Sequence, residues 1–198
     1  KYGSDAFRYY FAQAVSPFED GDFTESKFIE TYNAHLANGI GNLFSRVIAM
    51  SENYFAGTVK RGTENDVLVR VSTDDEVGTI RNMSIGDFIE SYIQKEYEHA
   101  MYDYEIHHAV ASVLKLITLL DKYITLHEPF KLIKTDRSKT ENILWNLLCG
   151  ITHIVRLLEP IIPDTALKIR DGIKVEGEGN ARIFNVKRPD KLLFKRID

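Results

Sequence analysis

Three polar residues at intervals of four, Asn38, Asn42 and Arg46, have side chains that could recognise a polar ligand. In a helix, residues four apart lie on one face, and His35 falls on the same polar face. Asparagine amides match the hydrogen-bonding edges of nucleic-acid bases, and arginine stacks on a base or binds a phosphate. The same spacing also suits a solvated face or a face that packs against another helix. Both interpretations stay open at this point.

A second set of candidate residues lies far along the chain, in the stretch YITLHEPFKLIK that ends at Lys134. Pro129 is expected to end a helix and to present Phe130 at the turn, beside Lys131 and Lys134. An aromatic side chain with lysines nearby can form a platform on which a base stacks. Phe130 taken alone would suit the hydrophobic core equally well.

Catalytic and metal-binding patterns are missing from the sequence. There is no glycine-rich phosphate loop and no Gly-x-Ser-x-Gly turn. The single cysteine, Cys149, excludes an internal disulfide and a multi-cysteine zinc site, and no histidine pair has the spacing of metal ligands. We therefore expect no catalytic residue, no metal site and no cofactor within this chain.

Composition predicts an ordinary folded protein. The chain has 198 residues, of which 44% are hydrophobic and 27% are charged. Its net charge of −4 means that a nucleic acid would have to bind to a local basic patch, and DNA is not expected as a partner. No apolar run is long enough to span a bilayer, so no membrane partner is expected. The lone cysteine suits a reducing compartment, and we expect the cytoplasm.

The spacing of apolar residues predicts an all-α fold, an antiparallel helical bundle. Thr24 is a good N-cap for one long helix that ends near Ala56, and Ser84 is a good N-cap for the next. Further helices are expected over 105–126 and 139–158. The expected organisation begins with a helix and linker over 1–23, followed by the bundle over 24–172. The bundle contains an insertion at 58–83, in which 67–71 and 77–80 pair as a hairpin. An irregular C-terminal tail over 173–198 docks on another part of the protein.

Two glycines interrupt the expected long helix, Gly39 and Gly41. Each glycine in a helix interior costs about 1 kcal/mol relative to alanine. Their presence predicts that another helix or a ligand backbone comes close to this part of the helix.

Several separated segments resemble, in order and spacing, the C-terminal part of class I methionyl-tRNA synthetases. These segments are KYGSDAFRYYF, DGDFTESKFIETYNAHLANGIGNLFSR, DKYITLHEPFKLIK, LLEPIIP and LLFKRID, and the resemblance covers the chain except about residues 60–82. It implies that Asn38, Asn42 and Arg46 face the CAU anticodon of methionine tRNA. It also implies that Pro129 and Phe130 form the turn whose aromatic ring packs on the first anticodon base, with His35, Lys131 and Lys134 as additional RNA contacts.

The resemblance also implies where the chemistry of the whole enzyme would lie. The family's catalytic motifs would precede Lys1, so residues 1–23 would lead out of a catalytic domain, and this chain alone would not activate methionine. ATP, Mg and Zn would belong to that catalytic part. The expected partners are the anticodon loop of methionine tRNA and the catalytic domain of the same chain.

Three departures from the family pattern concern the expected RNA site. Phe130 stands where the family usually has tryptophan, His35 replaces a commonly acidic residue, and Asp121 replaces an asparagine. Two alternative functions remain: the anticodon-binding domain of a related synthetase for cysteine, leucine, isoleucine or valine, and a helical protein-interaction bundle without catalytic activity.

Overall fold

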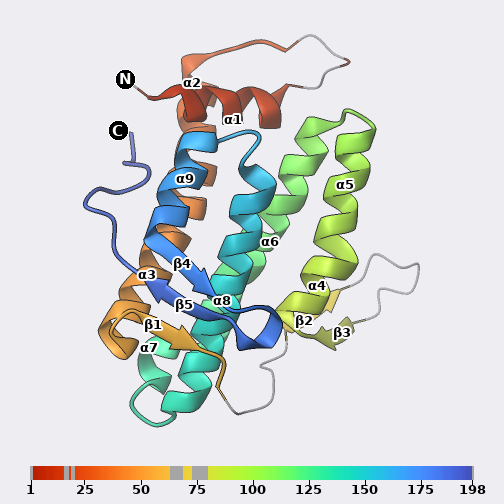
Figure 1. Ribbon diagram of the computed structural model, residues 1–198. Coiled ribbons are helices and arrows are strands. Elements are labelled where there is room, and N and C mark those ends of the chain that lie inside the picture. Colours follow the sequence, from red (N-terminus) through yellow and green to blue (C-terminus); the bar gives the residue numbers. More distant parts are fainter. Residues whose placement is uncertain (1, 16–17, 19–20, 63–68, 73–79, 198) are drawn as a thin grey trace.

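The computed structural model describes all residues except 1, 16–17, 19–20, 63–68, 73–79 and 198. Long helices lie side by side along most of the molecule, with α1 across one end and a small sheet on one face (Figure 1). The predicted all-α bundle is confirmed. In chain order, the helical elements are α1 (Ser4–Ala14), α2 (Glu25–Thr31), η1 (Tyr32–Gly41), α3 (Asn42–Phe55), α4 (Ile85–Phe88), η2 (Ile89–Ile93), α5 (Gln94–Tyr102), α6 (Ile106–His127), α7 (Pro129–Leu132), α8 (Arg137–Leu158), α9 (Pro163–Gly172) and η3 (Gly179–Ala181).

Helix ends lie where the capping residues predict them. The Thr24 hydroxyl accepts a hydrogen bond from the backbone N–H of Lys27 at 3.3 Å, and the Ser84 hydroxyl accepts one from Asp87 at 3.0 Å. Each bond satisfies an N–H group that has no partner within the first turn of its helix. Ala56 ends α3 in the left-handed conformation, with φ of 51°.

The expected long helix is not uniform, because η1 is a π-helical segment between α2 and α3. Gly39 has non-helical backbone angles (φ −81°, ψ −107°) within it. A Cβ at Gly39 would lie 3.9 Å from the nearest side-chain carbon of Ile117, which belongs to α6. A Cβ at Gly41 would lie 2.8 Å from the carbonyl oxygen of Leu36 and 3.6 Å from the ring of Phe194. The glycines thus permit a wide turn and close neighbours.

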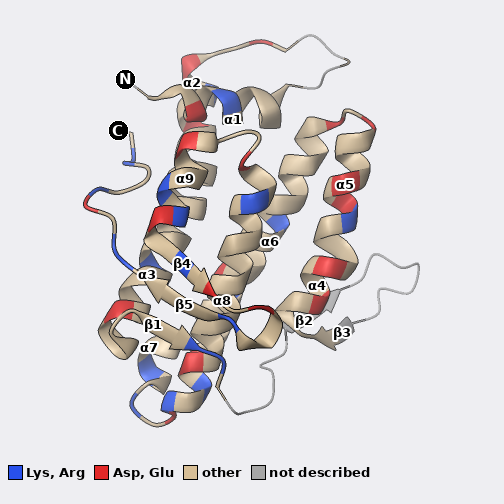
Figure 2. Cartoon of the chain, in the orientation of Figure 1, with Lys and Arg blue, Asp and Glu red and all other residues tan. Residues whose placement is uncertain are grey.

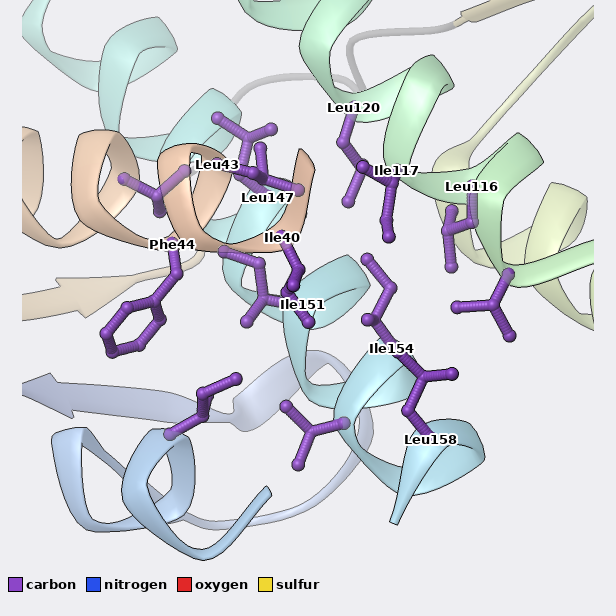
Figure 3. Close-up of a cluster of buried hydrophobic side chains, with 14 of the residues drawn as sticks. Ile40, Leu43, Phe44, Leu116, Ile117, Leu120, Leu147, Ile151, Ile154 and Leu158 are labelled. Atoms are coloured by element: carbon purple, nitrogen blue, oxygen red, sulfur yellow. The ribbon is translucent and has the colours of Figure 1, made fainter. Parts of the chain in front are cut away.

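The hydrophobic core lies between α3, α6 and α8 (Figure 3). Leu43, Leu120 and Leu147, one from each helix, are completely buried. The same cluster of buried side chains extends from Ala6 in α1 to Val186 near the C-terminus. The chain therefore has a continuous core of its own, and we expect it to fold as one unit.

A three-stranded antiparallel sheet covers one face of the bundle. Its strand order is β1 (Thr58–Lys60), β5 (Ile183–Val186) and β4 (Ile173–Glu176). The sequence predicts an irregular tail from residue 173, whereas residues up to Val186 supply two of these strands. The buried ring of Phe184 lies opposite Val59 on one side and Val175 on the other, so packing stabilises strands that are too short to show a clear pattern.

The remaining tail docks on the bundle. Asn33 donates a hydrogen bond to the backbone oxygen of Ile197 at 2.8 Å and accepts one from its N–H at 2.9 Å. The Tyr32 hydroxyl donates to the backbone oxygen of Lys195, and the ring of Phe194 packs edge-on against Tyr32. These contacts hold the tail against η1, while Leu192 stays exposed.

A hairpin forms in the expected insertion, where β2 (Val69–Ser72) pairs antiparallel with β3 (Ile80–Met83). Val71 lies opposite Arg81. The predicted pairing of 67–71 with 77–80 falls partly outside the described residues, which omit Val67 and Val77. Within the described part of the chain, no helix has the length and apolar character needed to cross a membrane.

Candidate nucleic-acid interface

An open groove of about 1030 Å³ lies between the η1–α3 segment and α6. It brings together polar side chains from segments about 75 residues apart, such as Arg46 and Asp121. Four predicted site residues line one wall, although the helix that carries them is π-helical in part. The polar and charged residues that line the groove are His35, Asn38, Asn42 and Arg46 from η1 and α3, and Thr118, Asp121, Lys122, Thr125 and Glu128 from α6 and its end.

The amides of Asn38 and Asn42 are available to a ligand. Both side chains are exposed, and neither has a hydrogen-bond partner among the described residues. An asparagine amide carries a carbonyl acceptor and an NH₂ donor, which can pair together with one base edge. This wall of the groove can therefore distinguish ligands by hydrogen-bonding pattern.

Arg46 is held in place by an ion pair across the groove. Its Nη1 lies 3.0 Å from Oδ1 of Asp121, and the two side chains are 37% and 32% exposed. Burial raises the pKa of Asp121, and the Arg46 guanidinium opposes that rise. Because the carboxylate offsets the positive charge, Arg46 offers an oriented guanidinium plane more than a net charge. The sequence singled out Asp121 as a departure but did not reveal this pairing.

His35 enters the groove as a neutral group. Burial lowers its pKa below the ordinary value, so the imidazole is uncharged at neutral pH. Tyr9 of α1 lies edge-on to its ring at a centroid distance of 6.0 Å. Nδ1 of His35 is buried and has no hydrogen-bond partner within the described part of the structure. His35 can therefore contribute one hydrogen bond to a ligand, but no positive charge.

The side of the groove toward α8 is fixed by hydrogen bonding. The Tyr123 hydroxyl accepts a bond of 3.1 Å from Nδ2 of Asn146, which lies in α8. The ring of His127 packs edge-on against Tyr123 at 4.5 Å. Burial lowers the pKa of His127, and nearby Lys139 lowers it further. Tyr123 is thus held by a hydrogen bond on one side and by ring packing on the other.

The second predicted set lies just beyond the end of the groove. Pro129 is buried and opens α7, so its role here is to begin the short helix that carries Phe130. Phe130 is 44% exposed and is not among the residues that line the groove, which extends only to Glu128. Lys131 forms an ion pair of 2.6 Å with Glu128, and Lys134 is exposed.

Basic residues gather at this end of the molecule. Figure 2 shows Lys and Arg residues concentrated at α7, the following turn and the start of α8. They are Lys131, Lys134, Arg137 and Lys139. Although the net charge of the chain is negative, residues 128–139 carry more basic than acidic residues, the acidic ones being Glu128 and Asp136, so the segment around Phe130 is locally basic.

The single cysteine of the chain is poorly suited to act as a nucleophile. Burial raises the pKa of the Cys149 thiol to about 12, which keeps it protonated and a poor nucleophile. Among the described residues, no three His, Cys, Asp or Glu side chains gather as metal ligands. The groove therefore offers recognition by hydrogen bonds and stacking.

Sequence reasoning did not identify the α6 wall. Thr118 and Lys122 are four residues apart, as are Asp121 and Thr125, so both pairs lie along one helical face. This polar face was visible in the sequence, but nothing in the spacing indicated that it opposes η1.

The helical bundle and its polar groove have the features of a domain that recognises a polar ligand. The N-terminal part of the chain, residues 1–48, matches the family model of class I tRNA synthetases (M). The model of the anticodon binding domain of methionyl tRNA ligase matches residues 74–185, more than half of the chain. The chain therefore belongs to the methionyl-tRNA ligase family.

Individual relatives agree with the family models. Methionine–tRNA ligase from Fusobacterium nucleatum is 32% identical over 192 residues, which are 96% of this chain and 27% of the relative. The Synechocystis enzyme of the same name is 31% identical over 170 residues, 85% of this chain and 30% of the relative. The chain thus spans less than a third of the length of these two relatives. They do not support the alternative of a synthetase for cysteine, leucine, isoleucine or valine.

Solved structures show the same fold. The free form of Mycobacterium tuberculosis methionyl-tRNA synthetase matches with a TM-score of 0.80 and 18% identity, over 100% of this chain and 39% of that chain. The same enzyme in complex with methionyl-adenylate matches with a TM-score of 0.74 and 20% identity, over 97% of this chain and 37% of that chain.

Proposed function

We propose that the groove between η1–α3 and α6 binds the anticodon loop of methionine tRNA. The observation that carries this proposal is the placement of two exposed amides, Asn38 and Asn42, in one open groove with the oriented guanidinium of Arg46. Sequence-specific RNA recognition targets loops whose bases are splayed out, stacked and hydrogen-bonded. The groove offers both kinds of contact on a rigid helical scaffold.

Each residue has a distinct role in this proposal. Asn38 and Asn42 pair with base edges, and Arg46 presents a plane on which a base stacks. His35 adds one neutral hydrogen bond. Asp121 keeps the Arg46 guanidinium across the groove, at 3.0 Å, so that its orientation does not depend on the RNA.

Phe130 extends the proposed site beyond the groove. Its 44% exposure leaves a ring surface on which the first anticodon base can stack, and Pro129 fixes the turn beneath it. Lys131 and Lys134 lie on the same turn and attract the RNA backbone, with Lys131 partly neutralised by Glu128. Phenylalanine offers a smaller ring than tryptophan and lacks its N–H donor.

The activity of the whole protein follows as part of the same proposal. We infer that this chain supports ATP-dependent attachment of methionine to its tRNA, together with a catalytic domain of the same protein. ATP, Mg and Zn would be bound by that domain. We place the protein in the cytoplasm, where its tRNA partner and its single reduced cysteine are both expected.

Competition binding tests the proposed groove. Wild-type protein and Asn42→Ala are titrated with methionine tRNA and with the same tRNA carrying an altered anticodon. Asn42→Ala should weaken binding of methionine tRNA by about 1 to 3 kcal/mol and change binding of the altered tRNA far less, because only a base-specific contact is lost. Asn53→Ala is the matched control, since Asn53 is an exposed asparagine of α3 outside the groove.

Two results would count against the proposal. An equal loss of affinity for both RNAs would show that Asn42 acts on structure or on the backbone alone. Absence of tRNA binding by the folded wild-type chain would favour the alternative of a protein-interaction bundle.

A further inference from the structure

A second cavity, of about 560 Å³, lies between the start of α4 with η2, the middle of α8 and the connection between β4 and β5. Figure 1 shows these elements together on the face that carries the sheet. No residue of this cavity lines the groove, so the two are separate sites. The side chains that line it and enter the argument are Arg61, Glu90, Trp145, His153, Arg156 and Arg182.

The cavity is lined by several charged side chains. Arg61, Arg156 and Arg182 line it, together with the carboxylate of Glu90. Among the described residues, no carboxylate forms an ion pair with Arg156 or Arg182. His153 is neutral because burial and the two nearby arginines lower its pKa to about 4. Arg156 and Arg182 therefore bring two positive charges to the cavity, against one negative charge from the Glu90 carboxylate, and neither arginine forms an ion pair with a described carboxylate.

The basic residues are positioned by neutral partners. Nη2 of Arg156 donates a hydrogen bond of 2.6 Å to Oε1 of Gln94. The indole N–H of Trp145 donates to the backbone oxygen of Arg182 at 2.9 Å. The guanidinium of Arg61 lies 5.4 Å from the centroid of the Trp145 ring. The bond to Gln94 orients the Arg156 guanidinium without neutralising it, and the bond from Trp145 fixes the backbone of Arg182 at the cavity.

We propose that this cavity binds a small phosphomonoester, such as a sugar phosphate or a nucleotide. A phosphomonoester carries about −1.5 to −2 charges near neutral pH and three acceptor oxygens, which suits several convergent guanidinium groups. The volume lies within the range of about 300 to 1000 Å³ for small-molecule sites. This binding is additional to the proposed recognition of tRNA.

Burial favours a small ligand over a stretch of RNA. Trp145 and Asn146 line the cavity and are only 7% and 6% exposed, so the cavity reaches into the core. A smaller cavity of about 260 Å³ shares His153, Arg156 and Arg182 with it. The side chains of Arg156 and Arg182 thus lie between two adjoining recesses.

Fluorescence of Trp145 tests the proposal directly, because it is the single tryptophan of the chain and lines the cavity. The 198-residue chain is titrated with ribose 5-phosphate, with inorganic phosphate and with sodium chloride at matched ionic strength. We expect a saturable change with ribose 5-phosphate that sodium chloride does not reproduce. A flat response up to about 10 mM, where even weak specific binding would appear, would overturn the proposal.

Charge variants locate the binding site. Arg156→Gln should weaken binding of ribose 5-phosphate about tenfold or more, because a charge-assisted contact is lost. Arg182→Gln should do the same, and thermal melts followed by circular dichroism verify that each variant is folded. Arg170→Gln is the matched control and should bind as wild type. Arg170 is an exposed residue of α9, and it pairs with Glu159 outside the cavity.

The control separates a site from a general charge effect. Equal weakening by Arg170→Gln and Arg156→Gln would show non-specific attraction and would overturn the proposal. Saturable binding of a short single-stranded RNA, with no response to ribose 5-phosphate, would assign the cavity to RNA and would also overturn it. Neither outcome changes the test of the anticodon groove, which depends on Asn42.

Discussion

The groove and the arginine-lined cavity use charge in opposite ways. In the groove, Arg46 is paired with Asp121, while the amides of Asn38 and Asn42 have no partner in the described structure. In the cavity, the neutral side chain of Gln94 holds Arg156, which forms no ion pair with a described carboxylate. Neutral amides distinguish ligands by hydrogen-bonding pattern, whereas cations without a carboxylate partner select for negative charge. One scaffold thus supports two kinds of recognition.

The two regions share a wall. Tyr123 lines the groove, Asn146 lines the cavity, and a hydrogen bond of 3.1 Å joins them across the α6–α8 interface. Leu120 is fully buried at the same interface. The contrast between the regions therefore depends on a common core, and changes to that core should affect both.

The largest expected effect is on that shared core. Leu120→Ala should lower the free energy of unfolding by about 2 to 5 kcal/mol, because it removes a buried side chain and leaves a cavity. Urea denaturation measures the loss, and binding at both sites should weaken together. Leu126→Ala is the control for stability. Leu126 lines the groove but is 69% exposed, so its truncation should change the free energy of unfolding much less. A loss confined to one site would contradict the shared wall.

The next largest effect is on RNA binding at the turn beyond the end of the groove. Phe130→Ala should weaken binding of methionine tRNA by about 1 to 3 kcal/mol, the range for a lost base–aromatic stack. Stability should change little because the ring is 44% exposed. Electrophoretic titration measures the affinity. Exposed Phe11 of α1 supplies a matched control, and an equal effect of Phe11→Ala on RNA binding would count against stacking at Phe130.

A smaller change in RNA affinity is expected from a substitution that removes the charge difference between the two regions. Asp121→Asn leaves Arg46 without its carboxylate, so the groove gains positive charge. We expect RNA binding to strengthen by up to about 1 kcal/mol and to depend more steeply on salt. Discrimination between anticodons should fall, because Arg46 then attracts any phosphate. Titration of both tRNAs at two salt concentrations checks this, and an unchanged salt dependence would contradict it.

The last effect is the pH dependence that distinguishes the half-buried histidines of the two regions. His153 and His35 both have lowered pKa values, to about 4 for His153 from the ordinary 6.5. A lowered pKa means that the folded state binds fewer protons than the unfolded state in this range. The stabilisation is therefore present above pH 6.5 and is lost as pH falls toward about 4.

Substitution of each histidine shows which residue causes this dependence of the free energy of unfolding on pH. His153→Gln should remove a larger part of the fall in stability between about pH 6.5 and about pH 4.5 than His35→Gln does. Chemical denaturation at several pH values measures it. His108→Gln, at an exposed site, is the control. A slope that is unchanged in His153→Gln would show that this histidine is not shielded as the structure indicates.

The sequence by itself determined the helices and one wall of the groove. Helical periodicity depends on neighbouring residues, so the spacing of Asn38, Asn42 and Arg46 was enough to place them on one face. Capping is equally local, which is why Thr24 and Ser84 marked the helix starts. The π-helical turn of η1 was not visible in this pattern, which carries no signal for the non-helical backbone angles of Gly39.

Only the tertiary structure decided what each polar residue contacts. Asn33 looks like Asn38 and Asn42 in the sequence, yet it binds the backbone of the C-terminal tail because that tail docks on η1. Asp121 and Arg46 became a pair only through the packing of α6 on α3. The arginine-lined cavity assembles Arg61, Arg156 and Arg182 from distant segments. No local rule relates such residues, because the long-range packing of the core sets the distances between them.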